Sequence, residues 1–252
     1  MNMFEPDYAH WYRRDGVPLH AVPAAESWLR RPTLRDARQL GLLPSVTNIL
    51  GIAARPRLVS WLQEQAPLAA LTPPRIKGES EDVFAKRVVT GSWTTHSGAA
   101  DFGTAFPYGS LRLFCDWYQA KGLHAVWAER VLVNLTAGYA GTADLLVKHP
   151  VHGLTLLVLK TQFLMPRARP VPHRSWCCQL AAYRRALGQP VACANIILNS
   201  RVPMEPVEYH WSEKELDRGW AAFDAARTRW CIKKNFDPCA HGDASDESVF
   251  PA

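Results

Sequence analysis

The spacing of apolar residues changes abruptly near the middle of the chain, and this change limits the possible folds more than any other feature. Over residues 103–119, large apolar side chains recur every three or four positions, which predicts a helix. From residue 126 the period becomes two, which predicts three consecutive strands at 126–135, 138–148 and 154–161. Residues 149–153 carry the Pro and Gly typical of a turn, so the second and third strands are expected to form a hairpin.

The second half of the chain alternates between helix and strand patterns. Residues 176–187 have helical spacing and are followed by Gly188, a residue typical of helix ends. Two strands are predicted at 191–198 and 207–211, and the sequence 212–215 is a capping box that begins a last helix. The order helix, three strands, helix, two strands, helix predicts an α/β fold with a central mixed β-sheet flanked by helices.

The first part of the chain is less regular. Residues 1–43 are rich in Pro and Arg without a sustained period, and we expect an N-terminal extended arm. Ser45 or Thr47 is expected to cap a helix at 45–50, and shorter helices are predicted near 58–65 and 81–89. At 252 residues, the chain fits one α/β domain over 44–240, followed by a flexible C-terminal tail at 241–252.

Composition and charge narrow the function only slightly. The net charge of +6 and the pI of about 9.1 are compatible with a polyanionic partner. The N-terminal residues lack the apolar core of a signal peptide and no run is long enough to cross a bilayer, so a cytoplasmic protein without a membrane partner is expected. The six cysteines are scattered, so we expect reduced thiols and no iron–sulfur cluster. The oligomeric state is not indicated.

One set of polar residues has the spacing needed for phosphodiester chemistry. Gly141 and Asp144 lie on one predicted strand, Lys160 ends the next, and Gln179 and Tyr183 follow on a helix. Neighbouring strands are about 5 Å apart, so side chains on one face of the hairpin converge. A carboxylate there can hold a divalent cation that polarises a phosphate, while a lysine orients the attacking water.

These residues, in this order, resemble the signature of the lambda-exonuclease/RecB-like branch of the PD-(D/E)XK nuclease superfamily, which includes phage and mitochondrial genome-maintenance exonucleases. Residues 44–50 and 103–106 also resemble upstream motifs of that branch, so the similarity spans about residues 44–238. The resemblance implies a restriction-endonuclease-like core, Mg²⁺ or Mn²⁺ as cofactor, and DNA ends or single-stranded regions as partner.

The resemblance also implies a role for each matched residue. It makes Asp144 a metal ligand, with the backbone carbonyl of Leu159 as a further ligand. Lys160 is then the catalytic lysine, and Gln179 and Tyr183 position that lysine or the DNA. Asp144 can alternatively be interpreted as a residue that makes a turn contact, and Lys160 as a solvated lysine. For Gln179 and Tyr183, the alternative interpretation is ordinary packing of a helix face.

Two positions depart from the family pattern. Val158 stands where the family has its second carboxylate, and Pro107 stands where it has a histidine. We therefore expect a DNA-binding protein of exonuclease ancestry in which hydrolysis is weakened or lost, so that its status as an enzyme is open. One alternative is an active Mg²⁺-dependent exonuclease whose missing carboxylate is supplied by Glu129, or whose missing oxygen is supplied by Gln162. Another is a scaffold protein that binds no nucleic acid.

A basic segment precedes the helix that carries Gln179. Arg167, Arg169 and Arg174 are predicted to contact DNA phosphates, because this segment must lie beside Lys160; a solvated loop is the alternative. Among the histidines, His124 and His210 have no ligand-like spacing in the sequence, and we expect them to be surface or core residues.

Overall fold

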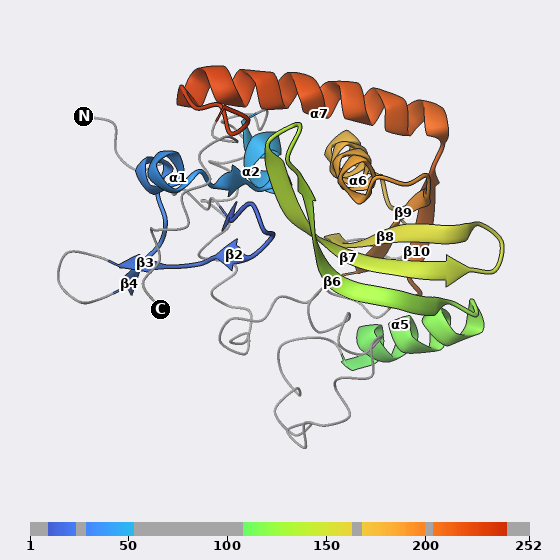
Figure 1. The fold of residues 1–252 in the computed structure, drawn as a ribbon. Helices are drawn as coiled ribbons and strands as arrows, with labels where there is room; N and C mark the ends of the chain where they lie inside the picture. Colours follow the sequence, from blue (N-terminus) through green and yellow to red (C-terminus); the bar gives the residue numbers. More distant parts are fainter. Residues whose placement is uncertain (1–9, 24–28, 53–107, 163–167, 200–203, 241–252) are drawn as a thin grey trace.

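The fold is that of a computed structural model, which describes residues 10–23, 29–52, 108–162, 168–199 and 204–240 (Figure 1). The described residues form a layered α/β structure with a central sheet between helices. The predicted fold class, an α/β fold with a central mixed β-sheet flanked by helices, is therefore confirmed.

The central sheet has five strands within the described residues, in the order β10-β9-β8-β7-β6. Neighbouring strands are antiparallel, except that β8 and β9 are parallel and are joined by a crossover through a helix. Their bounds differ by at most two residues from those predicted: β6 (His124–Asn134), β7 (Tyr139–His149), β8 (Gly153–Gln162), β9 (Ala192–Asn199) and β10 (Val207–Trp211).

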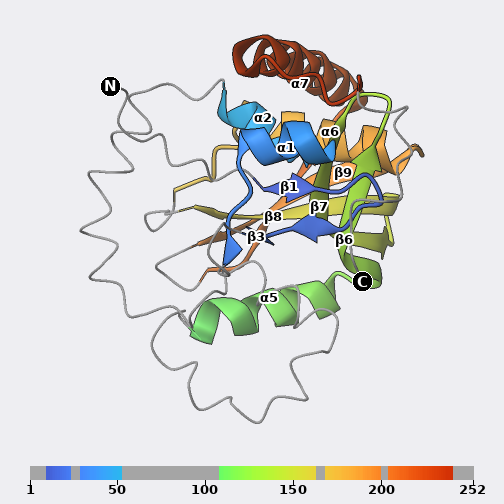
Figure 2. The same ribbon diagram turned by 60° about the vertical axis from the view of Figure 1, so that its left-hand side comes forward.

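Three helices cover the two faces of this sheet. α5 (Tyr108–Ala120) lies on one face, and α6 (Arg174–Leu187) and α7 (Glu213–Lys234) lie on the other, with α6 between α7 and the sheet (Figures 1 and 2). The predicted ends are confirmed: α6 is followed by Gly188 in the left-handed conformation, with a φ of 73°. The capping box at Ser212 and Glu215 begins α7.

Alternation along β8 divides the core into two layers. Leu156 and Val158 belong to the main core beneath α6 and α7. Leu157 and Leu159 belong to a second core with Phe114 of α5. Because successive side chains of a strand point to opposite faces, a nearly continuous apolar strand serves both layers.

The segment before residue 44 differs from the predicted extended arm where the structure describes it. It contains a helix and short antiparallel strands, and Trp11 is only 2% exposed within the main core, in edge-on contact with Trp230 and Phe236. The sequence did not indicate this because the strands are too short to show a period and the ring partners lie more than 200 positions away. The elements are β1 (Trp11–Tyr12), β2 (Pro18–Leu19), β3 (Val22–Pro23), β4 (Leu29–Arg30), α1 (Leu34–Leu40) and β5 (Leu43–Pro44). The domain boundaries at 44 and 241 stay predictions.

The next helix begins as predicted. α2 (Val46–Gly51) is capped by Ser45, whose side chain accepts a hydrogen bond from the Asn48 amide. The helices predicted near 58–65 and 81–89, and the position of Pro107, lie outside the described residues. No helix in the described ranges is both long and apolar enough to cross a membrane.

Candidate functional site

The candidate site lies where β7 and β8 separate. Their backbone pairing extends from the turn as far as Leu145 opposite Leu157, and Asp144 is the next residue along β7. Its Oδ2 accepts a hydrogen bond of 2.8 Å from the backbone N–H of Leu159. The carboxylate, on a residue that is only 7% exposed, thus bonds to β8 beyond the last pair of the ladder.

The predicted lysine is held by the two predicted helix residues. Lys160 Nζ donates to Gln179 Oε1 at 2.6 Å, and Gln179 Nε2 donates to Tyr183 Oη at 3.0 Å. Gln179 and Tyr183 are buried and lie one turn apart on α6. The structure therefore brings Lys160, Gln179 and Tyr183 into one chain of hydrogen bonds, next to the residue whose amide contacts Asp144.

Gly141 has a steric role in this chain. A Cβ added to it would lie 2.7 Å from Cε1 of Tyr183, which is closer than real Cβ contacts allow. The tyrosine ring therefore occupies the space above β7 that a side chain at 141 would need. Burial raises the pKa of Tyr183, and the Asp144 carboxylate raises it further, so the carboxylate lies near this ring and the phenol stays neutral.

Val158 occupies the place where the resemblance requires a second carboxylate. Its side chain is 1% exposed and belongs to the main core. Strand alternation places it on the same face as Lys160, the face covered by α6. Position 158 therefore contributes apolar contacts and no ligand.

Glu129 is aligned with Asp144 across the neighbouring strand. The β6–β7 pairs on either side place the two residues opposite one another. Glu129 has a φ of 52°, an uncommon conformation for a non-glycine residue within a strand, and such strain is concentrated at functional sites. Its carboxylate also contributes to the raised pKa of Tyr183, after burial and Asp144. Glu129 is exposed whereas Asp144 and Tyr183 are buried, so the two carboxylates are aligned in the register but differ in environment.

Two neutral oxygens lie on the adjoining part of β8. The N–H of Leu159 points toward Asp144, and in a strand the carbonyl of the same residue points to the same edge. Gln162 Oε1 is buried and has no hydrogen-bond partner among the described residues. Carboxylate, carbonyl and amide oxygens are the donors preferred by Mg²⁺ and Mn²⁺, so the donor types at this place fit such an ion.

The basic segment enters α6 beside the lysine chain. Arg169 and Arg174 are exposed, and Arg174 is the first residue of α6. Arg167 lies outside the described residues. Both of these arginines are therefore accessible to an anion from solution.

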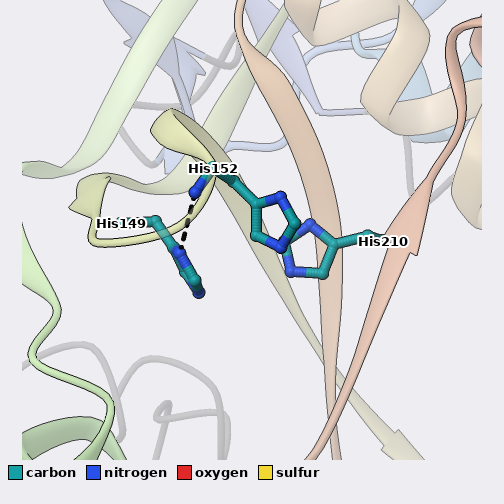
Figure 3. Close-up of side chains that lie close together, drawn as sticks. All are labelled: His149, His152 and His210. Atoms are coloured by element: carbon teal, nitrogen blue, oxygen red, sulfur yellow. Dashed lines mark hydrogen bonds between the residues drawn. The ribbon is translucent and has the colours of Figure 1, made fainter.

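Sequence reasoning missed a second polar cluster. His149, His152 and His210 place their ring nitrogens within 4.8 Å of one another, at the turn between β7 and β8 (Figure 3). The expectation that His210 is an ordinary surface or core residue was therefore incomplete. The short spacing of His149 and His152 was a weak signal, but nothing local indicated that His210 joins them.

Comparisons with known proteins give only distant structural matches. No family model matches the chain, and no curated protein matches it in sequence. A proposed exonuclease from Eubacterium rectale is 10% identical, with a TM-score of 0.41, over 70% of this chain and 79% of its own. The protein SSO0001 is 13% identical, with a TM-score of 0.28, over 70% of this chain and 92% of its own. Likenesses this distant do not assign an activity.

Proposed function

We propose that the chain is a DNA-binding protein of PD-(D/E)XK nuclease ancestry in which metal-dependent phosphodiester hydrolysis is weakened or lost. The observation that carries this proposal is the Lys160–Gln179–Tyr183 chain beside Asp144, combined with a valine buried at position 158. The lysine proposed to bind a phosphate is present, whereas a valine stands at the position of one proposed cation ligand.

The residues proposed to bind phosphate are cationic and lie on β8 and on the segment that leads into α6. Lys160 is held in position by Gln179, so little side-chain entropy is lost when it contacts a phosphate. Arg169 and Arg174 are exposed on the segment that follows β8. With a net charge of +6, these side chains favour a nucleic acid over a neutral partner.

The proposed cation site has fewer oxygen ligands than the family pattern supplies. Divalent cations such as Mg²⁺ are commonly held by one or two carboxylates together with substrate phosphate and water. One oxygen of Asp144 is already engaged by Leu159, and Val158 supplies no donor. Loss of one ligand, or even of a residue that supports a ligand, lowers metal affinity or activity by about 10- to 100-fold or more.

A second candidate function rests on Glu129. Its position opposite Asp144 would place a carboxylate on β6 in place of the one missing from β8, and its left-handed backbone is uncommon for a non-glycine residue. Under this hypothesis, Asp144 and Glu129 would bind the cation, and the Leu159 carbonyl would be a third ligand. The cation would polarise the phosphate, and Lys160 would orient the attacking water. The chain would then be an active exonuclease.

Cleavage assays separate the two functions. Linear duplex and single-stranded DNA are incubated with purified protein in Mg²⁺ or Mn²⁺, with Asp144→Ala, Glu129→Ala and the control Glu205→Ala tested alongside. We expect no more degradation by the wild type than by Asp144→Ala. Efficient multiple turnover that Asp144→Ala abolishes would overturn the weakened-site proposal, and its simultaneous loss in Glu129→Ala would establish the relocated carboxylate.

Fluorescence anisotropy with labelled single-stranded and duplex DNA tests the binding claim. We expect binding that weakens as salt increases and that Lys160→Ala reduces, because that lysine contacts a phosphate. Absence of binding at low salt by folded wild-type protein would overturn the DNA-binding proposal and favour a scaffold role.

A further inference from the structure

The histidine cluster lies at the opposite end of the hairpin from the candidate nuclease site. His149 ends β7, His152 lies in the turn before β8, and His210 lies on the edge strand β10 (Figure 3). The ring centroids of His152 and His210 are 3.8 Å apart, and those of His149 and His152 are 4.7 Å apart. His149 is five residues from Asp144, or about 17 Å along an extended strand, so the two clusters are separate.

The ring of His149 is fixed and largely buried. Its Nδ1 accepts hydrogen bonds from the amides of Val151 and His152, at 3.0 and 3.2 Å. These bonds hold the turn and orient the ring so that Nε2 lies beside the Glu208 carboxylate. The residue is 7% exposed, and Nε2 is buried without a hydrogen-bond partner among the described residues.

The Glu208 carboxylate adjoins two of the three rings. Its Oε1 lies 2.8 Å from His210 Nε2, a hydrogen bond, and 3.3 Å from His149 Nε2. The second contact is within ion-pair distance but is not aligned as a hydrogen bond.

We propose that His149, His152 and His210 form a binding site for a late first-row transition-metal ion such as Zn²⁺. Three imidazoles are the donors that Zn²⁺, Ni²⁺ and Cu²⁺ prefer, whereas Mg²⁺ prefers oxygens. The site therefore differs in ion class from the oxygen-rich place beside Asp144 and does not depend on the proposed nuclease ancestry.

The hydrogen bonds of the cluster rank the three ligands. An ionised Glu208 only accepts, so His210 donates from Nε2 and is left with Nδ1 to coordinate. A ligating histidine whose other nitrogen donates to a carboxylate is a common arrangement at metal sites. His210 is thus available through Nδ1, and for His152 and His210 to bind one ion their rings, now 3.8 Å apart between centroids, must turn edge-on to it.

His149 differs in its proton balance. Because its Nδ1 accepts two amide hydrogens, the neutral ring carries its hydrogen on Nε2. Coordination by His149 therefore requires it to give up the two amide hydrogen bonds, so that Nδ1 binds the ion while Nε2 keeps its hydrogen beside Glu208. His149 therefore contributes less to affinity than the other two rings.

A bound ion would join the turn between β7 and β8 to the edge strand β10. Metal binding that depends on the folded arrangement stabilises that arrangement. The expected consequence is a higher unfolding temperature in the presence of the ion.

Calorimetric titration of chelator-treated, dialysed full-length protein tests the proposal, with Zn²⁺ and Mg²⁺ in parallel and thermal unfolding followed by circular dichroism. We expect one Zn²⁺ per chain, a raised unfolding temperature, and neither effect with Mg²⁺. His152→Gln and His210→Gln each lower the Zn²⁺ affinity at least about tenfold. His149→Gln lowers it less, and the exposed control His124→Gln leaves it unchanged.

Two results would overturn the site. One is wild-type protein that neither binds Zn²⁺ nor gains stability at a several-fold molar excess. The other is binding that survives in the folded double variant H152Q/H210Q, which would place the ion on other residues such as cysteines. Because His152 is an exposed turn residue, His152→Gln is expected to fold and keeps the test decisive.

Discussion

The β7–β8 hairpin carries a polar cluster at each of its ends, and the two clusters differ in chemistry. At the open end, Asp144 contacts β8 and Lys160 is tied to α6. At the turn, three histidines lie together, and Glu208 adjoins two of them. The first cluster offers oxygens and an amine, which suits a hard cation and a phosphate, and the second offers imidazoles.

The two ends also differ in how strand geometry creates them. At the open end, backbone pairing between β7 and β8 stops at Leu145, and the next contact with β8 is made by the side chain of Asp144. At the turn, the backbone amides of the hairpin itself orient His149. A site at a strand opening therefore depends on pairing register, whereas a site at a turn depends on local backbone shape. Four predictions probe the open end, for comparison with the histidine variants at the turn.

The largest effect is expected from Val158→Asp. Placing a carboxylate in the main core should lower the free energy of unfolding by about 3–5 kcal/mol in EDTA. If position 158 faces the cation, Mn²⁺ should restore part of that loss, as any ligand of the folded state does. Chemical denaturation with and without Mn²⁺ measures both quantities.

Leu157→Asp is the matched control, because Leu157 is equally buried but belongs to the core beneath α5. Its stability loss should not respond to Mn²⁺. Equal recovery in both variants would show that the open end has no preferred cation-facing side.

A smaller loss is expected from Asp144→Ala. The N–H of Leu159 would lose its partner, which should lower the free energy of unfolding by about 1–3 kcal/mol. Asp144→Asn should lose less, since an amide oxygen can still accept that hydrogen. Urea denaturation of both variants provides the comparison, and equal losses would mean that this bond does not hold the strand opening.

Gly141→Ala tests the steric link between β7 and α6. The added methyl would lie 2.7 Å from the Tyr183 ring, so we expect a loss of about 1–3 kcal/mol from overpacking. DNA affinity should also fall, because a displaced Tyr183 releases Gln179 and with it Lys160. Denaturation and anisotropy are measured on the same protein.

Gly51→Ala provides the control, because nothing lies within 4 Å of the added methyl at that position. It should leave stability unchanged or raise it by about 0.5–1 kcal/mol, as expected for alanine in a helix. A Gly141→Ala variant that matches this control would show that Tyr183 is free to move.

The smallest effect is expected from the exposed arginines. Arg169→Gln and Arg174→Gln should each reduce the slope of log affinity for DNA against log salt by about 1, because each removes one phosphate contact. Arg229→Gln, an exposed control on α7, should leave the slope unchanged. Unchanged slopes in all three variants would show that bound DNA does not contact the arginines at the start of α6.

Local sequence patterns predicted most of the described elements after residue 108. The hairpin turn, the glycine after α6 and the capping box at Ser212 were all evident because each depends on neighbouring residues. The N-terminal segment was not, because Trp11 is placed by its contacts with Trp230 and Phe236. Contacts at such separation leave no periodic trace in a short segment.

The candidate site was predictable in composition but not in arrangement. The motif indicated that Lys160, Gln179 and Tyr183 belong together, and the structure links them by hydrogen bonds. It did not indicate that Asp144 would bond to the Leu159 amide, or that Glu129 would adopt a left-handed conformation opposite Asp144. Both features arise from pairing between strands, which a single strand's sequence does not specify.

The sequence by itself determined the order of strands and helices after residue 108, the turn that makes β7 and β8 a hairpin, and the residue types available for phosphate chemistry. These follow from periodicity and turn chemistry, which act over a few residues. Only the tertiary structure decided that β7 and β8 separate at Asp144, that Val158 is buried under α6, and that His210 reaches His149 and His152. The reason is that strand register and helix placement are set by the sum of many weak contacts across the whole core, and side chains distant in sequence meet only after that sum has selected one arrangement.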